Sequence, residues 1–336
     1  MALRRSEELT AIDKAFRQTY HSELLPQLKR MEFVRIILFF IFTVWSLGTI
    51  AYAGLALWAC LNSPDTTLLH YLSVAAIVCS IFVAYRLLEF VLNLILKKKM
   101  LNSILKPFKT FKANKIFDIP SSQLKESKIV EKHVFKINPE RIEGVYKGVE
   151  IKFNTALLFD IERRYSAGKS RTKISNVFSG YIVEMDMNKQ FSGHTILESC
   201  LYHTDESFFD FLKDDYYEMN EVELEDPEFK KHFTQIKSTD QVEARYLLTP
   251  TVMEKLKELD MTLGRLLMLS DLRLSFLDKK ILLVMKVRNV NNLLRLCVLN
   301  KPLYKQDKEI CMFKDTLLEI LEIVDELELD EKVGTY

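Results

Sequence analysis

The sequence lacks the cysteine pattern of a disulfide-bonded or zinc-binding protein. It has 5 cysteines among 336 residues, an odd number without Cys-x-x-Cys spacing. Disulfide frameworks use even sets, and structural zinc sites use closely spaced pairs. Two of the five, Cys60 and Cys79, lie inside apolar runs. The composition therefore excludes a small disulfide-stapled fold and is typical of a reducing compartment.

Excess positive charge is also missing from most of the chain. The formal net charge of +1 combines +8 over residues 1–115 with −7 over residues 116–336. Nucleic-acid binding depends on Lys and Arg side chains that neutralise phosphates. The acidic C-terminal part therefore argues against a nucleic-acid partner.

A complete nucleotide-binding loop is absent. Gly168-Lys169-Ser170 resembles the end of a phosphate loop, but Arg163 stands where that loop needs its first glycine, and strand-like residues follow where the loop needs a helix. A basic turn that contacts an anionic ligand through Lys169 and Arg171 is one interpretation, and a solvated hairpin loop is the other. We expect no cofactor.

Other combinations of reactive side chains also fall short of a site. His194, Cys200, His203 and Asp205 carry metal-binding atoms within twelve residues, but their spacing fits no closed zinc pattern. We expect ordinary sheet or loop positions and no metal. The acidic series over residues 221–228 is interpreted as solvated surface and as acidic residues at the start of a helix. The sequence therefore favours a protein that is not an enzyme.

The chain has two long apolar runs. Residues 36–61 are uncharged, and a second run covers residues 68–85 and continues over 87–96. About 20 apolar residues cross a bilayer core of roughly 30 Å. We expect a transmembrane hairpin over residues 36–96, with spans of about 36–61 and 68–90. A cleaved signal peptide is the competing interpretation, but its apolar region has only about 7 to 15 residues and begins earlier.

Basic residues flank both spans on the same side. No Lys or Arg occurs in the connecting loop, residues 62–67. Because basic residues in short flanking segments stay on the cytoplasmic side, we expect both termini to be cytoplasmic. The lysines after the second span suit an anionic lipid surface; those predicted to contact it are Lys98, Lys99, Lys106, Lys109 and Lys112.

Two apolar stripes at helical spacing lie beside the hairpin. Membrane-surface helices and helices packed on the soluble domain explain them equally well. Small residues recur within both spans and are expected to pack against the other helix of the hairpin, with a dimer seam as the alternative. They are Gly48, Ala51 and Gly54 in the first span and Ala76, Ser80 and Ala84 in the second. The stripes are Leu9, Ile12, Phe16, Tyr20, Leu24 and Leu28, and Leu101, Ile104, Leu105, Phe108 and Phe111.

The remaining pattern predicts an α+β fold. Residues 1–35 form an amphipathic cytosolic segment, residues 97–128 a basic juxtamembrane linker and residues 129–336 a cytosolic α+β domain. Strands and helices occur in blocks without regular alternation. The expected strands cover residues 145–153, with a bend at Gly148, residues 177–187 and 191–197, and a hairpin of residues 272–276 and 281–287. The expected helices start at Asp226-Pro227, at residues 238–241 and at Thr249-Pro250, and a last helix covers residues 316–329.

Residues 238–250 are predicted to stabilise the fold. The spacing of Ser238 and Gln241 is that of a capping box, and Asp240, Glu243 and Arg245 are explained by capping and an ion pair on a helix. Tyr246 is expected to be buried on the apolar side of this helix. Catalysis by Asp240, Glu243 or Arg245 is the alternative.

Several segments resemble a known bacterial family, the one named domain of unknown function 3137. They are GVYKGVEIKF at 144–153, GKSRT at 168–172, FSGHT at 191–195, LEDPEFKKHF at 224–233 and STDQVEARYLLTP at 238–250. The resemblance covers roughly residues 130–330 and the two preceding spans. It implies a membrane-anchored bacterial protein with a cytosolic α+β domain, and it supplies no catalytic residue because the family has no established activity.

Together these features predict a cytosolic interaction module anchored in the inner membrane. Its partner is expected to be anionic lipid, with a protein as a further possible partner and the oligomeric state open. The alternative is a membrane-tethered enzyme that acts on lipid or nucleotide phosphates through Lys169 and Arg171. An enzyme should have a deep pocket with convergent ionisable groups, whereas a binding module should have a shallow groove or an exposed apolar patch.

Overall fold

The computed structural model resolves the chain into two compact units. One comprises Phe16–Ile104 and Leu296–Ile310, and the other comprises Met1–Ala15, Leu105–Arg295 and Cys311–Tyr336. The residues that the structure describes are 7–62, 68–113, 118–130, 135–137, 141–166, 169–187, 191, 193–199, 219–267, 269–287, 302–327 and 329.

The first unit is built on two long helices, α2 (Leu25–Asn62) and α3 (Leu68–Leu105), of 38 residues each. Helix α1 (Glu7–Thr19) precedes them and joins α2 through a π-helical turn, η1 (Tyr20–Leu24). In this turn the Leu25 N–H donates to the Tyr20 carbonyl. Pro26 follows at once and has no N–H to bond the preceding turn. The widened π-helical turn therefore ends directly before the proline.

The two long helices contact each other along a seam of α2 that differs from the predicted one. The rings of Phe42 and Tyr85 lie 6.1 Å apart, and Ala53 is buried. By contrast, an added Cβ at Gly48 or Gly54 would meet no atom within 4 Å. The expectation that these glycines pack within the hairpin is therefore wrong, and Ala76 and Ser80 of α3 are likewise exposed. The seam instead uses steps of three and four residues, which keep one helical face in contact; on α2 it comprises Phe42, Ser46, Thr49, Ala53 and Ala56.

Both predicted apolar stripes are inside the protein. In the first unit a short turn, η4 (Leu303–Lys305), packs on α2, and the Leu303 N–H donates to Glu32 Oε2 at 3.0 Å. Glu32 is also paired with Arg35 at 2.5 Å. The side chains of both stripes are buried, except that of Ile12, which is partly exposed. The buried members are Leu9, Phe16, Tyr20, Leu24, Leu28, Leu101, Ile104, Leu105, Phe108 and Phe111.

The second unit is an antiparallel sheet of ten strands among the described residues. The order is β1-β3-β4-β5-β10-β9-β6-β8-β7, with β2 paired to β4. The class is therefore α+β, as predicted. The strands are β1 (Lys112–Ala113), β2 (Phe135–Ile137), β3 (Arg141–Tyr146), β4 (Val149–Ser166), β5 (Lys169–Asp186), β6 (His194–Ser199), β7 (Asn220–Glu221), β8 (Phe233–Ser238), β9 (Leu269–Leu277) and β10 (Lys280–Val287).

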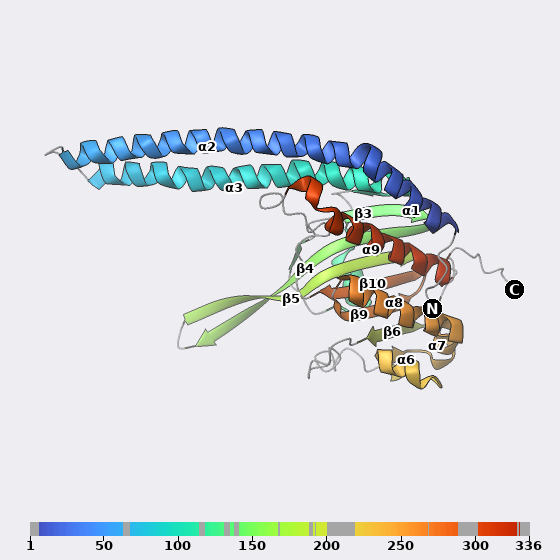
Figure 1. The fold of residues 1–336 in the computed structure, drawn as a ribbon. Helices are drawn as coiled ribbons and strands as arrows, with labels where there is room; N and C mark the ends of the chain where they lie inside the picture. Colours follow the sequence, from blue (N-terminus) through green and yellow to red (C-terminus); the bar gives the residue numbers. More distant parts are fainter. Residues whose placement is uncertain are drawn as a thin grey trace. The chain divides into compact units, whose positions relative to one another are not determined.

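Helices cover both faces of the sheet. On one face lie α8 (Pro250–Leu267) and α9 (Asp307–Glu326), as Figure 1 shows. The Ser199 hydroxyl of β6 donates to Asp260 of α8 at 2.6 Å on this face. On the other face lies the short helix α4 (Ser121–Glu126), whose Gln123 amide donates to Glu184 of β5 at 2.7 Å. The core therefore lies between the sheet and α8 and α9, with a smaller apolar cluster under α4.

Strands β4 and β5 continue past the rest of the sheet as a two-stranded arm (Figure 1). Strand β2 pairs with β4 only as far as Phe159. From there to the Ser166–Lys169 pair, the described strand partners are β4 and β5 alone. Residues 159–176 contain five basic and two acidic residues, so the arm carries a net positive charge.

The local signals in the sequence agree with the fold. Gly148 has a φ of +83° at the β3–β4 turn, Asp226 begins α6 (Pro227–His232), and Pro250 begins α8. Helix α9 starts at Asp307, nine residues before the predicted start. Residues 97–128, expected as a linker, carry the end of α3, the turn η2 (Lys106–Phe108), β1 and α4.

Candidate functional site

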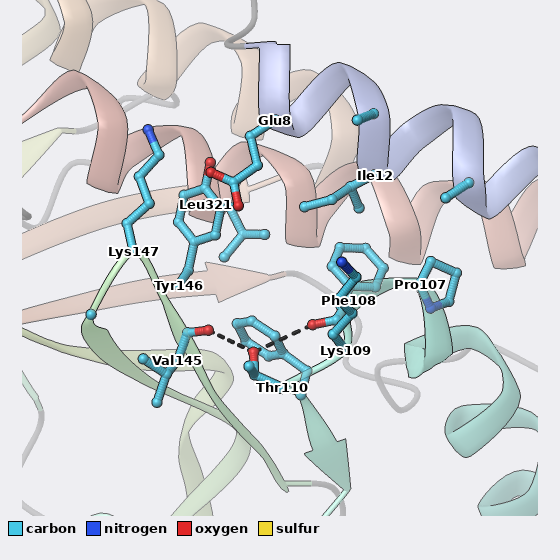
Figure 2. Close-up of a pocket in the computed structure, with 14 residues that line it drawn as sticks. Glu8, Ile12, Pro107, Phe108, Lys109, Thr110, Val145, Tyr146, Lys147 and Leu321 are labelled. Carbon is cyan, nitrogen blue, oxygen red and sulfur yellow. Dashed lines mark hydrogen bonds between the residues drawn. The ribbon is translucent and has the colours of Figure 1, made fainter.

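A cavity in the sheet unit lies beside the β3–β4 turn and has a volume of about 500 Å³. Four chain segments line it: residues 8–15 of α1, residues 107–111, residues 145–148 of the turn, and Leu321 of α9. Figure 2 shows these segments around the cavity, with Lys109 and Lys147 on opposite sides. The site therefore depends on residues from both ends of the chain.

Local backbone features shape the pocket walls. Pro107 lies in the first turn of η2, and Lys109 then ends the turn at a φ of 51°. The Phe111 ring lies against Gly144, where an added Cβ would come within 2.5 Å of the ring. Only glycine leaves room for that ring. The Thr110 hydroxyl donates to the Val145 carbonyl at 2.5 Å, which ties the η2 segment to the β3–β4 turn.

The walls are apolar and the charged groups lie at the rim. Lys147 Nζ is 2.7 Å from Asp325 Oδ1 of α9, and the Tyr146 hydroxyl donates to the other oxygen of Asp325 at 3.1 Å. Lys109 and Glu8 are exposed at the rim. Within the described part of the chain, no carboxylate is paired with Lys109. Such a pocket can hold an apolar group and leave one ammonium for its polar end.

Among the predicted lipid-contact residues whose side chains are described, Lys109 alone lines this pocket. Lys99, Lys106, Lys109 and Lys112 are all exposed, and Lys109 alone of these lines the cavity. The side chain of Lys98 lies outside the described residues. Sequence reasoning treated Lys109 as a surface charge, because no local pattern signals a pocket assembled from four distant segments.

Lys169 and Arg171 lie at the start of β5, at the far end of the arm. The register pairs Lys169 with Ser166 and Arg171 with Arg164. Strand structure precedes and follows the Gly-Lys-Ser sequence, which agrees with the prediction against a phosphate loop, since that loop must open a helix. The side chains of Lys169 and Arg171 lie outside the described residues.

The segment over residues 238–250 is partly as predicted. Asp240, rather than Ser238, is the N-cap of α7 (Gln241–Leu247) and accepts from the Val242 and Glu243 amides at 2.8 and 3.2 Å. Glu243 accepts from the Gly193 N–H at 2.5 Å, and so it does not close a capping box.

Tyr246 corrects the burial prediction. Its side chain is 79% exposed, and Val242, one turn earlier, is 64% exposed. Arg245 is exposed as well. The buried residues of this helix and its end are Ala244 and Leu248, so α7 turns the face opposite to the predicted one towards the core. Val242 and Tyr246 form a small exposed apolar patch.

Of the candidate metal-binding residues, His194 alone lies within the described residues. His194 is buried, and its Nε2 lies 2.8 Å from the Ser275 hydroxyl. Burial, assisted by the charge of Lys128, lowers the pKa of His194 to about 4. Cys200, His203 and Asp205 lie outside the described residues, and no group of three metal-binding side chains occurs among those described.

The acidic series has a structural role where it is described. Asp226 caps α6 by accepting from the Glu228 and Phe229 amides at 2.8 and 3.1 Å. The hydrogen bond from Phe229 is the main cause of its lowered pKa. This is the helix-start role that the sequence predicted.

Sequence reasoning missed the charged groups buried against the sheet. Arg273 of β9 is buried and contacts Glu198 Oε1 at 3.3 Å, the Ile129 carbonyl at 3.2 Å and Asp271. Burial would raise the pKa of Glu184, but Lys280 and Lys152, at 2.9 and 3.2 Å, outweigh it and lower that pKa. Their charges are matched locally, so these groups stabilise the fold without forming an open site.

Part of the chain matches a known protein family. No curated protein has significant sequence similarity to the chain. A crystal structure of the mycobacterial trehalose monomycolate transport factor A, TtfA, matches 51% of this chain and 74% of that chain, at 8% identity and a TM-score of 0.21. This TM-score is too low to establish a shared fold. Residues 176–329 match the family described as protein of unknown function (DUF3137), the family that the motifs between residues 191 and 250 predicted.

Proposed function

We propose that this protein is an interaction module anchored in the cytoplasmic membrane of a bacterium, with α2 and α3 as the spans and the sheet unit in the cytosol. The carrying observation is the exposure of both helices. In the most apolar 18-residue window of each, 6% and 0% of the residues are buried. An apolar surface of this length is unstable in water, and it matches what a bilayer core of roughly 30 Å covers.

Large apolar side chains are exposed on both helices. Phe40 and Trp58 of α2 are 68% and 67% exposed, and Phe90 of α3 is 62% exposed. The core helix of a soluble protein buries such residues. Lipid is therefore the environment that these helices fit.

The charge distribution supports an inward orientation for both termini. The loop between the helices lacks Lys and Arg, whereas both outer flanks are basic. The described lysines that follow α3, which are Lys106, Lys109 and Lys112, remain exposed, while the neighbouring stripe is buried. Contact between this segment and the inner leaflet would therefore be electrostatic rather than by insertion.

A binding role fits the sheet unit better than an enzymatic one. The pocket has apolar walls, and its ionisable groups stand apart at the rim. A second binding surface is available at the patch of Val242 and Tyr246. In the part of the chain that the structure describes, no nucleophile and base face the pocket together, so no specific observation favours the enzyme.

Topology reporters test the proposal. Alkaline phosphatase, which is active only in the periplasm, should be inactive when fused after Thr335 and active when inserted between residues 64 and 65. The chain should also stay in the membrane fraction after alkaline carbonate extraction. An active fusion after Thr335, or release by carbonate, would contradict the proposed anchor.

A further inference from the structure

We propose that the pocket beside the β3–β4 turn binds a long-chain fatty acid, a single apolar chain that ends in one carboxylate. This inference rests on the proposed function, because the membrane beside the sheet unit is the source of the ligand. It goes further by naming the ligand class and the residues that bind it.

The walls suit an apolar chain. Phe108, Phe111 and Leu321 line the cavity, and Ile12 and Ala15 of α1 complete it. Pockets for small ligands have volumes of about 300 to 1,000 Å³. At about 500 Å³ this one is in the lower half of that range, which favours one chain over the two of a phospholipid.

The rim suits a single negative charge. Lys147 is already neutralised by Asp325 at 2.7 Å. Lys109 has no carboxylate partner in the described part of the chain. Glu8, also at the rim, disfavours a second negative charge on the ligand. One available ammonium and one carboxylate nearby select a monoanion over a phosphate with two charges.

The pocket and the proposed membrane span are adjacent in the sequence. Helix α3 ends at Leu105, and the first pocket residue of this segment is Pro107. Lys99, in the basic flank of the span, precedes Leu105 by about 9 Å of helix. The pocket residues therefore follow the proposed membrane span directly in the sequence.

Photocrosslinking on the full chain tests the inference. The protein is reconstituted in phosphatidylcholine nanodiscs that contain a fatty acid with a photoreactive diazirine at its last carbons. After irradiation, mass spectrometry should locate labels on the spans and, separately, on residues 107–111 and Leu321. Moving the diazirine next to the carboxylate should shift the pocket label to Lys109 and Thr110.

Paired variants test the named contacts. Lys109→Gln should reduce pocket labelling by up to about fivefold, the size of an exposed ion pair, whereas Lys112→Gln, an exposed lysine outside the pocket, should not. Ala11→Phe adds a ring at the mouth and should abolish the pocket label. Lys14→Phe adds the same ring at an exposed position of α1 that does not line the pocket, and should leave the label intact.

The outcomes separate this inference from the proposed function. Unlabelled spans would contradict the membrane anchor itself. Labelled spans with an unlabelled pocket, in protein with an unchanged melting temperature, would overturn the fatty-acid site and leave the anchor standing. Equal pocket labelling by the matching fatty alcohol would overturn the assignment of a carboxylate to Lys109.

Discussion

His194 is a buried side chain that the fold keeps uncharged. Burial is the main cause of its pKa of about 4, against an ordinary value of 6.5. Below the ordinary value, the unfolded chain binds a proton that the folded protein excludes. Stability is therefore lost as the pH falls from 6.5 towards 4, by at most about 3 kcal/mol for this residue.

We predict that His194→Gln removes part of this acid sensitivity. The difference in melting temperature between pH 7.5 and pH 4.5 should be smaller in the variant, because Gln has no charge to acquire. Circular dichroism on the full chain in detergent measures the melting temperatures of the parent and the variant at the two pH values. An unchanged pH dependence would mean that other groups cause the acid response.

Asp240, the N-cap of α7, and Tyr246, on its exposed face, should contribute to stability in the opposite order to the one expected from a buried Tyr246. Asp240→Ala removes the cap that accepts from two amides and should cost about 1 kcal/mol, which lowers the melting temperature by about 2 to 4 °C. Tyr246→Ala removes an exposed ring and should change stability by less than about 0.5 kcal/mol. Asp240→Asn retains the cap and serves as the control. A larger loss from Tyr246→Ala than from Asp240→Ala would contradict the observed helix face.

At the scale of elements, the β4–β5 arm should be separable from the rest of the sheet. A two-stranded ribbon contributes little stability by itself, and beyond Phe159 the described strand pairing is between β4 and β5 alone. Replacing residues 161–174 by Asn-Gly joins Asp160 to its partner Ser175 through a two-residue turn. The melting temperature should stay within about 3 °C of the parent.

The control for the arm deletion is a change inside the sheet. Gly144→Val forces a side chain into the Phe111 ring and should destabilise the unit by about 1 to 3 kcal/mol. If the arm deletion were as harmful as Gly144→Val, the arm would be part of the folding core.

Local chemistry explains which elements were predictable. The helix starts at Asp226 and near Asp240 and the hairpin of β9 and β10 follow from side chains within a few residues of each element, and the sequence predicted all three. The exposed face of α7, the length of the arm and the four-segment pocket depend on contacts between distant residues. Lys109 shows the limit: its charge is visible in the sequence, whereas its place beside Phe111 and Leu321 is not.

For the whole molecule, the exposed lysines in the last turns of α3 and directly after it should respond to the charge of the membrane. Each basic residue near an anionic surface gains about 1 kcal/mol before screening. In full-length protein reconstituted with anionic lipid at low salt, Lys99, Lys106, Lys109 and Lys112 should be protected from chemical acetylation. At high salt, or in neutral lipid, the protection should disappear because charges are screened or missing.

Lys230 and Lys231, exposed in α6, provide the internal reference for acetylation, since they lie outside the basic segment. Equal protection of the reference lysines and of the lysines near the end of α3 under all conditions would contradict the predicted electrostatic contact. A fragment that starts at residue 97 would not serve, because it would expose the stripe of Leu101, Ile104 and Leu105, which is buried in the complete chain.

The lengths of α2 and α3 have a consequence for where the protein resides. The uncharged run of α2, residues 36–61, extends for about 39 Å as a helix, against a bilayer core of about 30 Å. A span that is too long for its membrane tilts or thickens the lipid around it, at a cost that grows with each ångström of excess. Under the proposed topology, the protein should therefore concentrate in the thicker regions of a membrane of uneven thickness.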